Sequence, residues 1–353
     1  MTMTQDEKYM ARCLSLAELG RNFVAPNPMV GAIIVHNDTI IGEGWHQQYG
    51  ETHAERNAIY SVENQSILSE STLYVNLEPC AHFGNTPPCA DLIITKKIKR
   101  VVIGCLDPNP KVSGKGVALM RDAGICVKVG VLENESRELN KRFIILQEKK
   151  RPFVLLKWAQ TADGFIDYLR TENLSKALRI SNDITTRFTH KMRAENMGIM
   201  VGTNTILLDN PLLTVRYWCG KNPTRITFDK SGKIPADVLI KNGESKTIIF
   251  SNELRESSKN VKYIFLENTE NNLQFVLNEL GKRNIHSILV EGGAKLLNSF
   301  IRLGLWDEAH VETSTQILNN GVKSPVIQDV YYCSEQIIEG HSCKHITRTV
   351  FRK

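Results

Sequence analysis

The sequence predicts two α/β domains in series. Its 353 residues exceed the roughly 250 to 300 at which one hydrophobic core stops growing. Apolar strand patterns alternate with amphipathic helix patterns in both halves. A charged run at 147–151 precedes a new apolar strand that opens at Pro152. We therefore expect one domain at 1–147 and a second at 151–353.

The first domain is expected to be a three-layer α/β/α structure around one sheet. Apolar runs predict strands at 31–36, 72–77, 100–104 and 125–129. Helical spacing predicts helices at 5–19, 54–63, 89–96 and 116–123. In the second domain, strands separated by helices are expected at 152–159, 198–201, 225–228, 247–250, 263–266, 287–290 and 308–312.

Composition narrows the class of protein. Apolar residues at 42% and charged residues at 23% are typical of globular chains and argue against disorder. The first twenty residues lack the apolar stretch of a signal peptide, and no run approaches the roughly 20 apolar residues of a membrane span. We therefore expect a cytoplasmic protein. The net charge of +6 suits anionic ligands, and the basic residues are dispersed, so we expect a small phosphorylated molecule and not a nucleic acid as partner. We also expect no membrane partner and a homo-oligomeric assembly.

One cluster of residues is typical of a metal site. Among eight cysteines only Cys80 and Cys89 are clustered, and each follows a proline. The segment 52–55, with His53 inside it, stands where a loop gives way to a predicted helix. One imidazole and two thiolates suit tetrahedral zinc whose fourth position is open to water. We therefore predict one zinc ion per chain, bound by His53, Cys80 and Cys89.

Glu55, two residues after His53, completes the chemistry of this cluster. Zinc makes a bound water acidic near neutral pH, and the resulting hydroxide can attack a carbon that carries an exocyclic amine. The amine leaves as ammonia when a carboxylate takes the water proton and passes it on. The cluster therefore predicts a zinc-dependent nucleobase-type deaminase with Glu55 as the proton carrier.

Other interpretations of these residues stay open. Thr52 and Glu55 also match a helix capping box, with Cys80 and Cys89 as small buried apolar residues. His82 could instead close the site as a fourth ligand, which would make the zinc structural. The alternative function is a deaminase of free or RNA bases with a non-catalytic second domain. Eight residues separate the cysteines, against two in base-editing deaminases, which argues against a nucleic-acid substrate.

Longer segments carry a resemblance to a known family. The segments PNPMVGAIIV, GEGWHQQYGETHAE, LEPCAHFGNTPPCADLI and DPNPKVSGKG resemble the deaminase domain of the bifunctional riboflavin-biosynthesis deaminase/reductase family. The segments LLKWAQTADG, MVGTNTILLDNPLLTVR and VEGGAKLLNSFI are similar to its reductase domain. The resemblance implies a cytidine-deaminase-like N-terminal domain followed by a dihydrofolate-reductase-like C-terminal domain.

The same resemblance implies two consecutive reactions on a phosphorylated pyrimidine. The first is hydrolytic deamination of a diamino-ribosylamino-pyrimidinone 5′-phosphate, and the second is NADPH-dependent reduction of the ribosyl group to a ribityl chain. It also implies that Asn27, Asp107 and Asn109 contact the deaminase substrate. The glycine-rich loop at 113–116 could hold an anion through free N–H groups, with a plain turn as the alternative.

The second half has no Gly-x-Gly-x-x-Gly after a strand, so a Rossmann site is not expected. Gly292 and Gly293 instead follow an apolar strand and precede a helix, where backbone N–H groups can meet a nucleotide phosphate. By resemblance, the NADPH contacts are Gln160, Arg179, Thr205, Asp209, Gly293, Ala294, Lys295, Leu296, Leu297, Asn298 and Ser299. By resemblance, the substrate contacts are Ala177, Arg193, Leu213, Arg216 and Glu291.

For some residues of the second half the resemblance leaves more than one role open. Lys157 and Asp163 lie in the expected strand-to-loop segment of the active site, where either could be catalytic or structural. For Arg193 and Arg216 the alternative to phosphate binding is a solvated surface charge. Four residues differ from those usual in the family, and they bear on substrate and nicotinamide contacts: Asn85, Asp167, Ala177 and Arg179.

Overall fold

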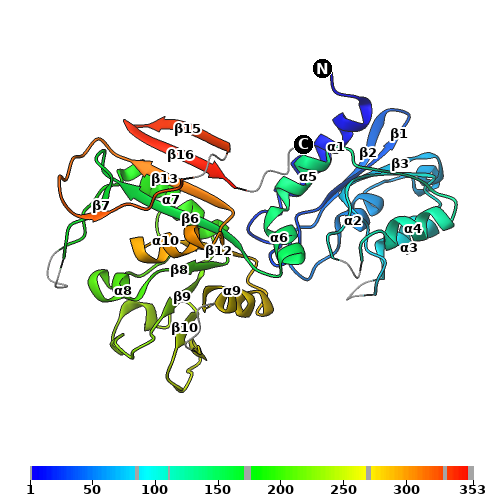
Figure 1. Cartoon of the computed structure of the whole chain (residues 1–353). Coiled ribbons are helices and arrows are strands. Elements are labelled where there is room, and N and C mark those ends of the chain that lie inside the picture. The colour runs from blue at the N-terminus through cyan, green and yellow to red at the C-terminus, as the bar shows by residue number, and fades with distance from the viewer. Residues whose placement is uncertain are drawn as a thin grey trace. The chain divides into compact units, whose positions relative to one another are not determined.

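The chain folds into two compact units (Figure 1). The structure is a computed structural model, and it describes residues 2–83, 87–109, 112–170, 176–267, 272–328 and 332–348. The first unit ends at Lys150 and the second begins at Arg151. This division falls inside the stretch at 147–151 where the charged run predicted a boundary. In the described ranges no helix is long and apolar enough to cross a bilayer.

The first unit is built on a five-stranded sheet in the order β2-β1-β3-β4-β5. Strands β3, β4 and β5 run parallel, and β1 is antiparallel to both of its neighbours. The strands are β1 (Gly31–His36), β2 (Thr39–Trp45), β3 (Thr72–Leu77), β4 (Arg100–Cys105) and β5 (Cys126–Val129). The sequence did not predict β2, because only two of its residues are buried and both are glycines, which weaken a strand pattern.

Helices cover both faces of this sheet, which confirms the predicted three layers. One apolar core joins α1 (Gln5–Glu18) to the sheet, next to α5 (Glu133–Leu139). The other core joins α2 (Ala54–Tyr60), α3 (Cys89–Thr95) and α4 (Lys115–Asp122) to the opposite face (Figure 1). A short 3₁₀ helix, η1 (Gln65–Glu70), follows α2, and α6 (Lys141–Lys149) ends the unit.

Local chemistry explains where these helices begin and how closely they pack. Thr4 and Glu7 form a capping box at the start of α1: the Glu7 N–H donates to Thr4 Oγ1 at 3.3 Å, and the Thr4 N–H donates to Glu7 at 2.7 Å. Helix α2 lies against β2 so closely that a Cβ at Gly44 would collide with the Ala58 backbone. The glycines of β2 therefore let the helix that carries His53 and Glu55 lie flat on the sheet.

The second unit is built on a nine-stranded sheet in the order β11-β10-β9-β8-β12-β6-β13-β16-β15. The first seven strands are parallel: β6 (Phe153–Gln160), β8 (Gly198–Met200), β9 (Thr224–Phe228), β10 (Thr247–Ser251), β11 (Val261–Phe265), β12 (Ser287–Val290) and β13 (Glu308–Thr313). An antiparallel hairpin of β15 (Tyr332–Ile338) and β16 (His341–Thr347) extends this sheet. The small strands β7 (Phe165–Asp167) and β14 (Val322–Lys323) pair separately.

Burial explains which strands of this unit could be predicted. Strands β6, β8, β10 and β12 are largely apolar because both faces of the sheet are covered there, whereas β9, β11 and β13 also carry polar or charged residues. The helices are α7 (Asp183–Glu195), α8 (Thr203–Asp209), α9 (Asn272–Lys282) and α10 (Ala294–Arg302), with a 3₁₀ turn at η2 (Leu239–Lys241). The hairpin β15–β16 was missed because its residues are largely polar and partly exposed. Since parallel strands end at a common edge, the loops after β9, β8, β12 and β6 converge there.

Candidate zinc centre and cofactor cavity

Three predicted ligands converge in the first unit. His53 is the N-cap of α2, Cys80 follows β3, and Cys89 is the first residue of α3. His53 Nδ1 lies 3.6 Å from Cys80 Sγ and 3.4 Å from Cys89 Sγ, and all three ligand atoms lie within 4.8 Å of one another. Tetrahedral zinc holds its nitrogen and sulfur ligands about 3.6 Å apart. The donor atoms are therefore spaced as zinc requires.

The two structural alternatives for this cluster do not fit. Helix α2 begins with His53 as N-cap and has no side-chain cap, while Thr52 Oγ1 instead donates to Asn57 Oδ1 at 2.6 Å, so the capping-box alternative is wrong. His82 is exposed and lies outside the metal-binding group found among the described residues. Zinc bound by these three residues would therefore have a fourth position open to water.

Electrostatics at the centre favour a thiolate beside a carboxyl group. Hydrogen bonds from Cys89, and then from His53, hold the pKa of Cys80 below its usual value. Glu55, at the second position of α2, is only 4% exposed. Burial, and next the charge of Cys80, raise the pKa of the Glu55 carboxyl to about 7. Glu55 lies in the first turn of α2, two residues after the N-cap residue His53.

A buried histidine that the sequence did not single out orients Asn27. His46 Nδ1 lies 3.1 Å from the Thr52 carbonyl oxygen, and its Nε2 lies 3.1 Å from Asn27 Nδ2. A carbonyl only accepts, so Nδ1 carries the proton and Nε2 accepts from the Asn27 amide. Burial lowers the pKa of His46, which keeps the ring neutral as this pattern requires. The Asn27 carbonyl oxygen takes no part in this bond and can accept one from a ligand.

Replacing His46 with alanine tests this arrangement. We expect His46→Ala to raise the KM of deamination about tenfold, because Asn27 loses the bond that orients its amide. Zinc content is expected to stay the same, since none of the three ligand atoms is removed. Steady-state kinetics and metal analysis measure both effects. A loss of kcat with an unchanged KM would contradict the role in positioning.

The predicted anion loop at 113–116 is already occupied from within the chain. The buried carboxylate of Glu78 accepts N–H bonds from Gly114 at 2.9 Å and Val117 at 3.2 Å, and from Asp107 at 3.2 Å. Within the loop, Gly114 donates to Glu78, and the Ser113 and Lys115 N–H groups donate to the carbonyl oxygens of Asn109 and Val112. The structure therefore favours the plain turn and helix start over an anion held by free N–H groups. Asp107 also accepts from the Asn109 N–H at 2.8 Å, and burial raises the pKa of Asp107.

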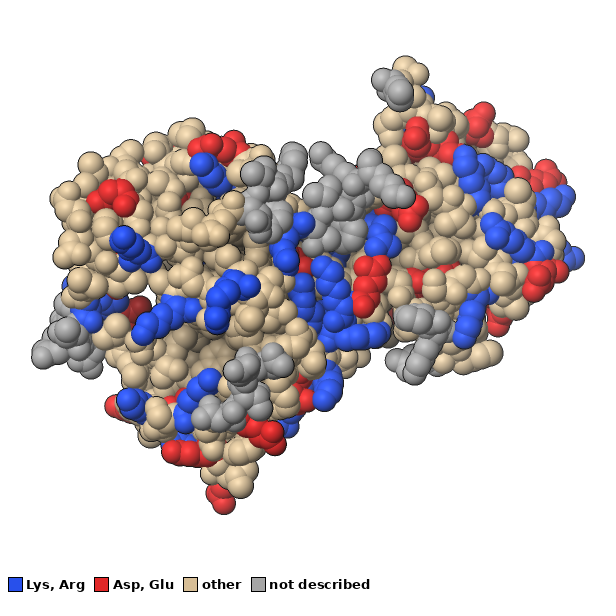
Figure 2. Space-filling model, in the orientation of Figure 1, with Lys and Arg blue, Asp and Glu red and all other residues tan. Residues whose placement is uncertain are grey.

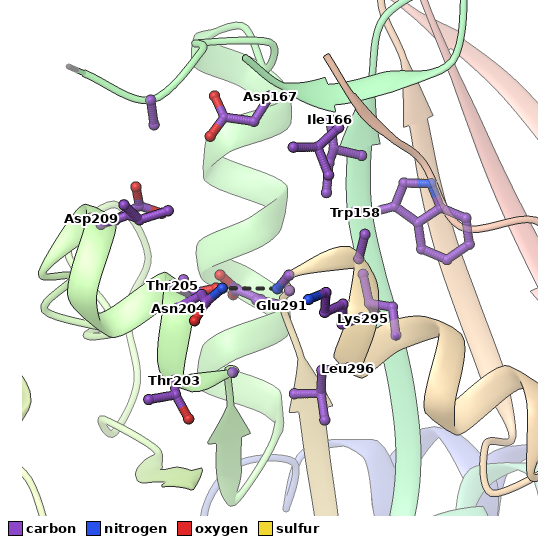
Figure 3. A pocket seen from close by; sticks show the side chains of 18 of the residues that line it. Trp158, Ile166, Asp167, Thr203, Asn204, Thr205, Asp209, Glu291, Lys295 and Leu296 are labelled. Carbon is purple, nitrogen blue, oxygen red and sulfur yellow. Dashed lines mark hydrogen bonds between the residues drawn. The ribbon is translucent and has the colours of Figure 1, made fainter. Parts of the chain in front are cut away.

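A cavity of about 1060 Å³ opens at the edge of the second sheet where β9, β8, β12 and β6 end (Figure 3). The starts of α8 and α10 form its central wall, where the Gly293 N–H donates to Thr205 Oγ1 at 3.2 Å. This volume is large enough for a dinucleotide. The predicted contact residues in its wall are Ala177, Arg179, Thr205, Asp209, Glu291, Gly293, Ala294, Lys295, Leu296, Leu297 and Ser299.

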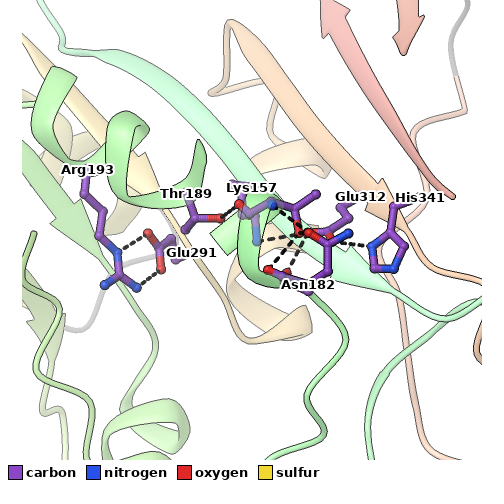
Figure 4. Close-up of polar contacts among 9 residues, drawn as sticks. Lys157, Asn182, Thr189, Arg193, Glu291, Glu312 and His341 are labelled. Carbon is purple, nitrogen blue, oxygen red and sulfur yellow. Dashed lines mark hydrogen bonds and ion pairs between the residues drawn. The ribbon is translucent and has the colours of Figure 1, made fainter. Parts of the chain in front are cut away.

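Five predicted residues do not line this cavity: Gln160, Arg193, Leu213, Arg216 and Asn298. Arg193 donates to Glu291 at 2.7 and 2.6 Å and to the Thr214 carbonyl at 3.0 Å (Figure 4). Its guanidinium therefore neutralises Glu291, a wall residue, instead of facing solvent. Gln160 accepts a bond from Trp158, and the Arg216 N–H donates to His190 Nδ1 at 2.9 Å.

An ion-pair network that the sequence did not reveal lines the same cavity. Arg170 pairs with Asp209 at 2.6 Å and with Asp167 at 2.5 Å. Asp167, one of the departures from the family pattern, therefore serves to hold this arginine, and Asp209 reaches the cavity with its charge compensated. Arg179 forms an exposed pair with Asp183. Asn85, another departure, lies outside the described residues.

Lys157 and Asp163, whose roles the sequence left undecided, have different surroundings in the structure. Asp163 accepts backbone N–H bonds from Leu318 at 3.1 Å and Asn319 at 2.7 Å, which is a structural role. Lys157 instead lines the cavity and lies 3.9 Å from Glu312 (Figure 4). Glu312 in turn accepts from His341 at 2.7 Å, so Lys157 is held within a buried polar network.

Comparisons with known proteins agree with both sites. Residues 3–105 match the cytidine and deoxycytidylate deaminase zinc-binding region, and residues 152–328 match the RibD C-terminal domain. The riboflavin biosynthesis protein RibD of Aquifex aeolicus is 39% identical over 326 residues, which cover 90% of this chain and 89% of that protein. The chain belongs to the RibD family. A second RibD, from Bacillus amyloliquefaciens, is 38% identical over 86% of this chain and 83% of its own length.

Solved structures extend the match to the fold. The diaminohydroxyphosphoribosylaminopyrimidine deaminase/5-amino-6-(5-phosphoribosylamino)uracil reductase of Thermotoga maritima has a TM-score of 0.85 at 36% identity, covering 97% of this chain and 98% of that one. RibD from Acinetobacter baumannii has a TM-score of 0.83 at 29% identity, covering 98% and 99%. The predicted cytidine-deaminase-like and dihydrofolate-reductase-like domains are confirmed. As a RibD-family member the chain is a bifunctional, zinc- and NADPH-dependent deaminase and reductase, and the alternative of a non-catalytic second domain is not favoured.

Proposed function

We propose that residues 1–147 deaminate 2,5-diamino-6-ribosylamino-4(3H)-pyrimidinone 5′-phosphate and that residues 151–353 reduce the resulting 5-amino-6-(5-phosphoribosylamino)uracil with NADPH. The observation that carries the proposal is the convergence of His53, Cys80 and Cys89 beside a buried Glu55. The cavity in the second unit supports the other half, because it presents the starts of two helices to a nucleotide-sized space.

In the first reaction each residue has a separate role. His53, Cys80 and Cys89 would hold zinc, which supplies a water of lowered pKa when bound. Glu55 takes the proton of that water and delivers it to the departing amine. Asn27, oriented by His46, offers its carbonyl oxygen to the pyrimidine. Asp107 and Asn109 contact the substrate from the loop after β4.

In the second reaction the protein positions two ligands against each other, and the nicotinamide supplies the hydride. Most of the predicted NADPH contacts gather around the start of α10 and the facing helix α8, whereas Gln160, Arg179 and Asn298 lie elsewhere. Glu291 meets the substrate at the end of β12, and Arg193 fixes the orientation of its carboxylate. Ala177 approaches from the loop before α7, whereas Leu213 and Arg216 would act from outside the cavity wall.

We also propose where the two reactions take place and how the chain assembles. Both reactions would take place in the cytoplasm on small phosphorylated pyrimidines, with the chain assembled as a homo-oligomer. The biosynthetic role named for the bacterial relatives supports a small metabolite as substrate, and the dispersed basic residues of the sequence argue against a nucleic-acid partner. Neither nucleic acid nor a membrane is needed for either step.

One assay on the intact protein tests the proposal. The diamino substrate and NADPH are supplied together, and ammonia release and NADPH oxidation are followed in the same sample. We expect equal amounts of ammonia and oxidised cofactor, with ammonia appearing first. Ammonia without NADPH oxidation would refute the reductase half, and NADPH oxidation only with pre-deaminated substrate would refute the deaminase half.

A further inference from the structure

The cofactor cavity extends along the edge of the sheet, so the strand order defines its two ends. Its wall takes residues from the ends of four adjacent parallel strands, in the order β9, β8, β12 and β6. Three strand spacings separate β9 from β6, a span of about 14 Å. The starts of α8 and α10 lie between, beyond β8 and β12. An extended dinucleotide can therefore lie along this edge, with its pyrophosphate near the middle.

The two ends of the cavity differ in exposure and charge. At the β6 end, Trp158 is 5% exposed and the Lys157 side chain 12% exposed. At the β9 end the wall is formed by Phe228 and by the exposed residues Lys230 and Lys233. Hydride transfer requires a site that excludes water, which places the nicotinamide at the β6 end. The adenosine then lies at the β9 end, where Phe228 offers an apolar surface to the base.

The loop that carries the two lysines is held in a defined shape. Asp229 is fully buried, and its Oδ1 accepts the Lys233 N–H at 2.8 Å and the Ile234 N–H at 3.3 Å. Its Oδ2 pairs with Arg255 at 3.4 Å. Thr203 at the start of α8 donates to the Phe228 carbonyl at 2.7 Å, which ties the loop to the central wall. The lysines are thus presented from a fixed backbone.

Other cations of the cavity are engaged or lie elsewhere. Arg170 is paired with two carboxylates, and Arg179 is paired with Asp183. Lys295 lies in the first turn of α10, beside the proposed pyrophosphate position. Lys230 and Lys233 form no ion pair with any carboxylate of the described ranges. They are therefore the cations at this end that can meet a further negative group.

From this arrangement we infer that Lys230 and Lys233 bind the 2′-phosphate of NADPH and set the preference of the enzyme for NADPH over NADH. The two cofactors differ only in that phosphate, which lies on the adenosine ribose. A basic side chain near this ribose is the usual way in which proteins accept the 2′-phosphate, and each lysine adds a charge-assisted hydrogen bond. The inference rests on NADPH use by this same cavity.

The test compares the two cofactors in the double variant Lys230→Gln/Lys233→Gln of the full chain. We expect the KM for NADPH to rise roughly 10- to 100-fold, while kcat at saturating NADPH and both constants for NADH stay within about twofold. Adenosine 2′,5′-bisphosphate should inhibit the parent protein far better than adenosine 5′-phosphate, and the variant should lose this difference. Lys230→Arg/Lys233→Arg should restore tight NADPH binding.

A matched control is Lys282→Gln, which removes an exposed lysine of α9 that pairs with Glu279 outside the cavity. It should leave the preference for NADPH intact. An unchanged preference in the Lys230/Lys233 variant, or an equal loss with NADH, would overturn the inference. Failure of the reductase proposal itself would look different, because the parent protein would then oxidise neither cofactor.

Discussion

Deamination by the Glu55→Gln variant is expected to fall by about 10²- to 10⁴-fold, the usual contribution of a positioned general acid–base group. Glutamine fills the same buried space at the second position of α2 but neither takes up nor releases the proton. His53, Cys80 and Cys89 are untouched, so about one zinc per chain should remain. Ammonia release and metal analysis on the same preparation measure the two quantities.

The control for this experiment is Glu63→Gln, which removes an exposed carboxylate shortly after α2. Its turnover should equal that of the parent protein. NADPH oxidation with pre-deaminated substrate should be unaffected in both variants, which shows that the second unit is intact. Normal ammonia release by Glu55→Gln with full zinc content would remove Glu55 from the mechanism.

The second large effect is expected from filling the cofactor cavity at Gly202. This residue has ordinary extended backbone angles, with φ of −75° and ψ of 159°, and a Cβ there would come no closer than 3.9 Å to any neighbour. A Cβ at Gly202 therefore meets no clash, and valine would add two further methyl groups at a residue that lines the space proposed for NADPH. We expect NADPH oxidation to fall by about 100-fold or more, as steric overlap costs several kcal/mol of binding.

Two measurements separate blocked binding from a damaged fold. Thermal unfolding of Gly202→Val should match that of the parent protein, and ammonia release should continue at the parental rate. Gly202→Ala adds a single methyl group and should lose far less activity. Retained NADPH oxidation in the valine variant would show that the cofactor does not pass this point of the wall.

Residues that act locally could be predicted from the sequence, whereas residues that act through distant partners could not. His53 and Glu55 share one helix turn, and the cysteines follow prolines, so their spacing alone indicated a metal centre. His46 acts through Asn27, 19 residues away, and nothing in its own segment marks that bond. Arg170 reaches Asp209 across 39 residues, from a segment without a motif.

The strands show the same contrast between local sequence signals and interactions with distant segments. Apolar runs such as β3 and β12 were predicted because burial on both faces leaves a continuous signal. Strand β2 and the hairpin β15–β16 pair with neighbouring strands but contribute few apolar residues to the cores. Their existence depends on the rest of the sheet, which a local pattern does not contain.

The carboxylate of Glu78 fixes the position of a predicted substrate contact. Its two oxygens accept the N–H groups of Asp107, Gly114 and Val117. A glutamine has one oxygen that accepts and an amide nitrogen that only donates, so Glu78→Gln would leave at least one of these N–H groups without its acceptor. The placement of Asp107 therefore depends on a carboxylate that lies outside the predicted contacts.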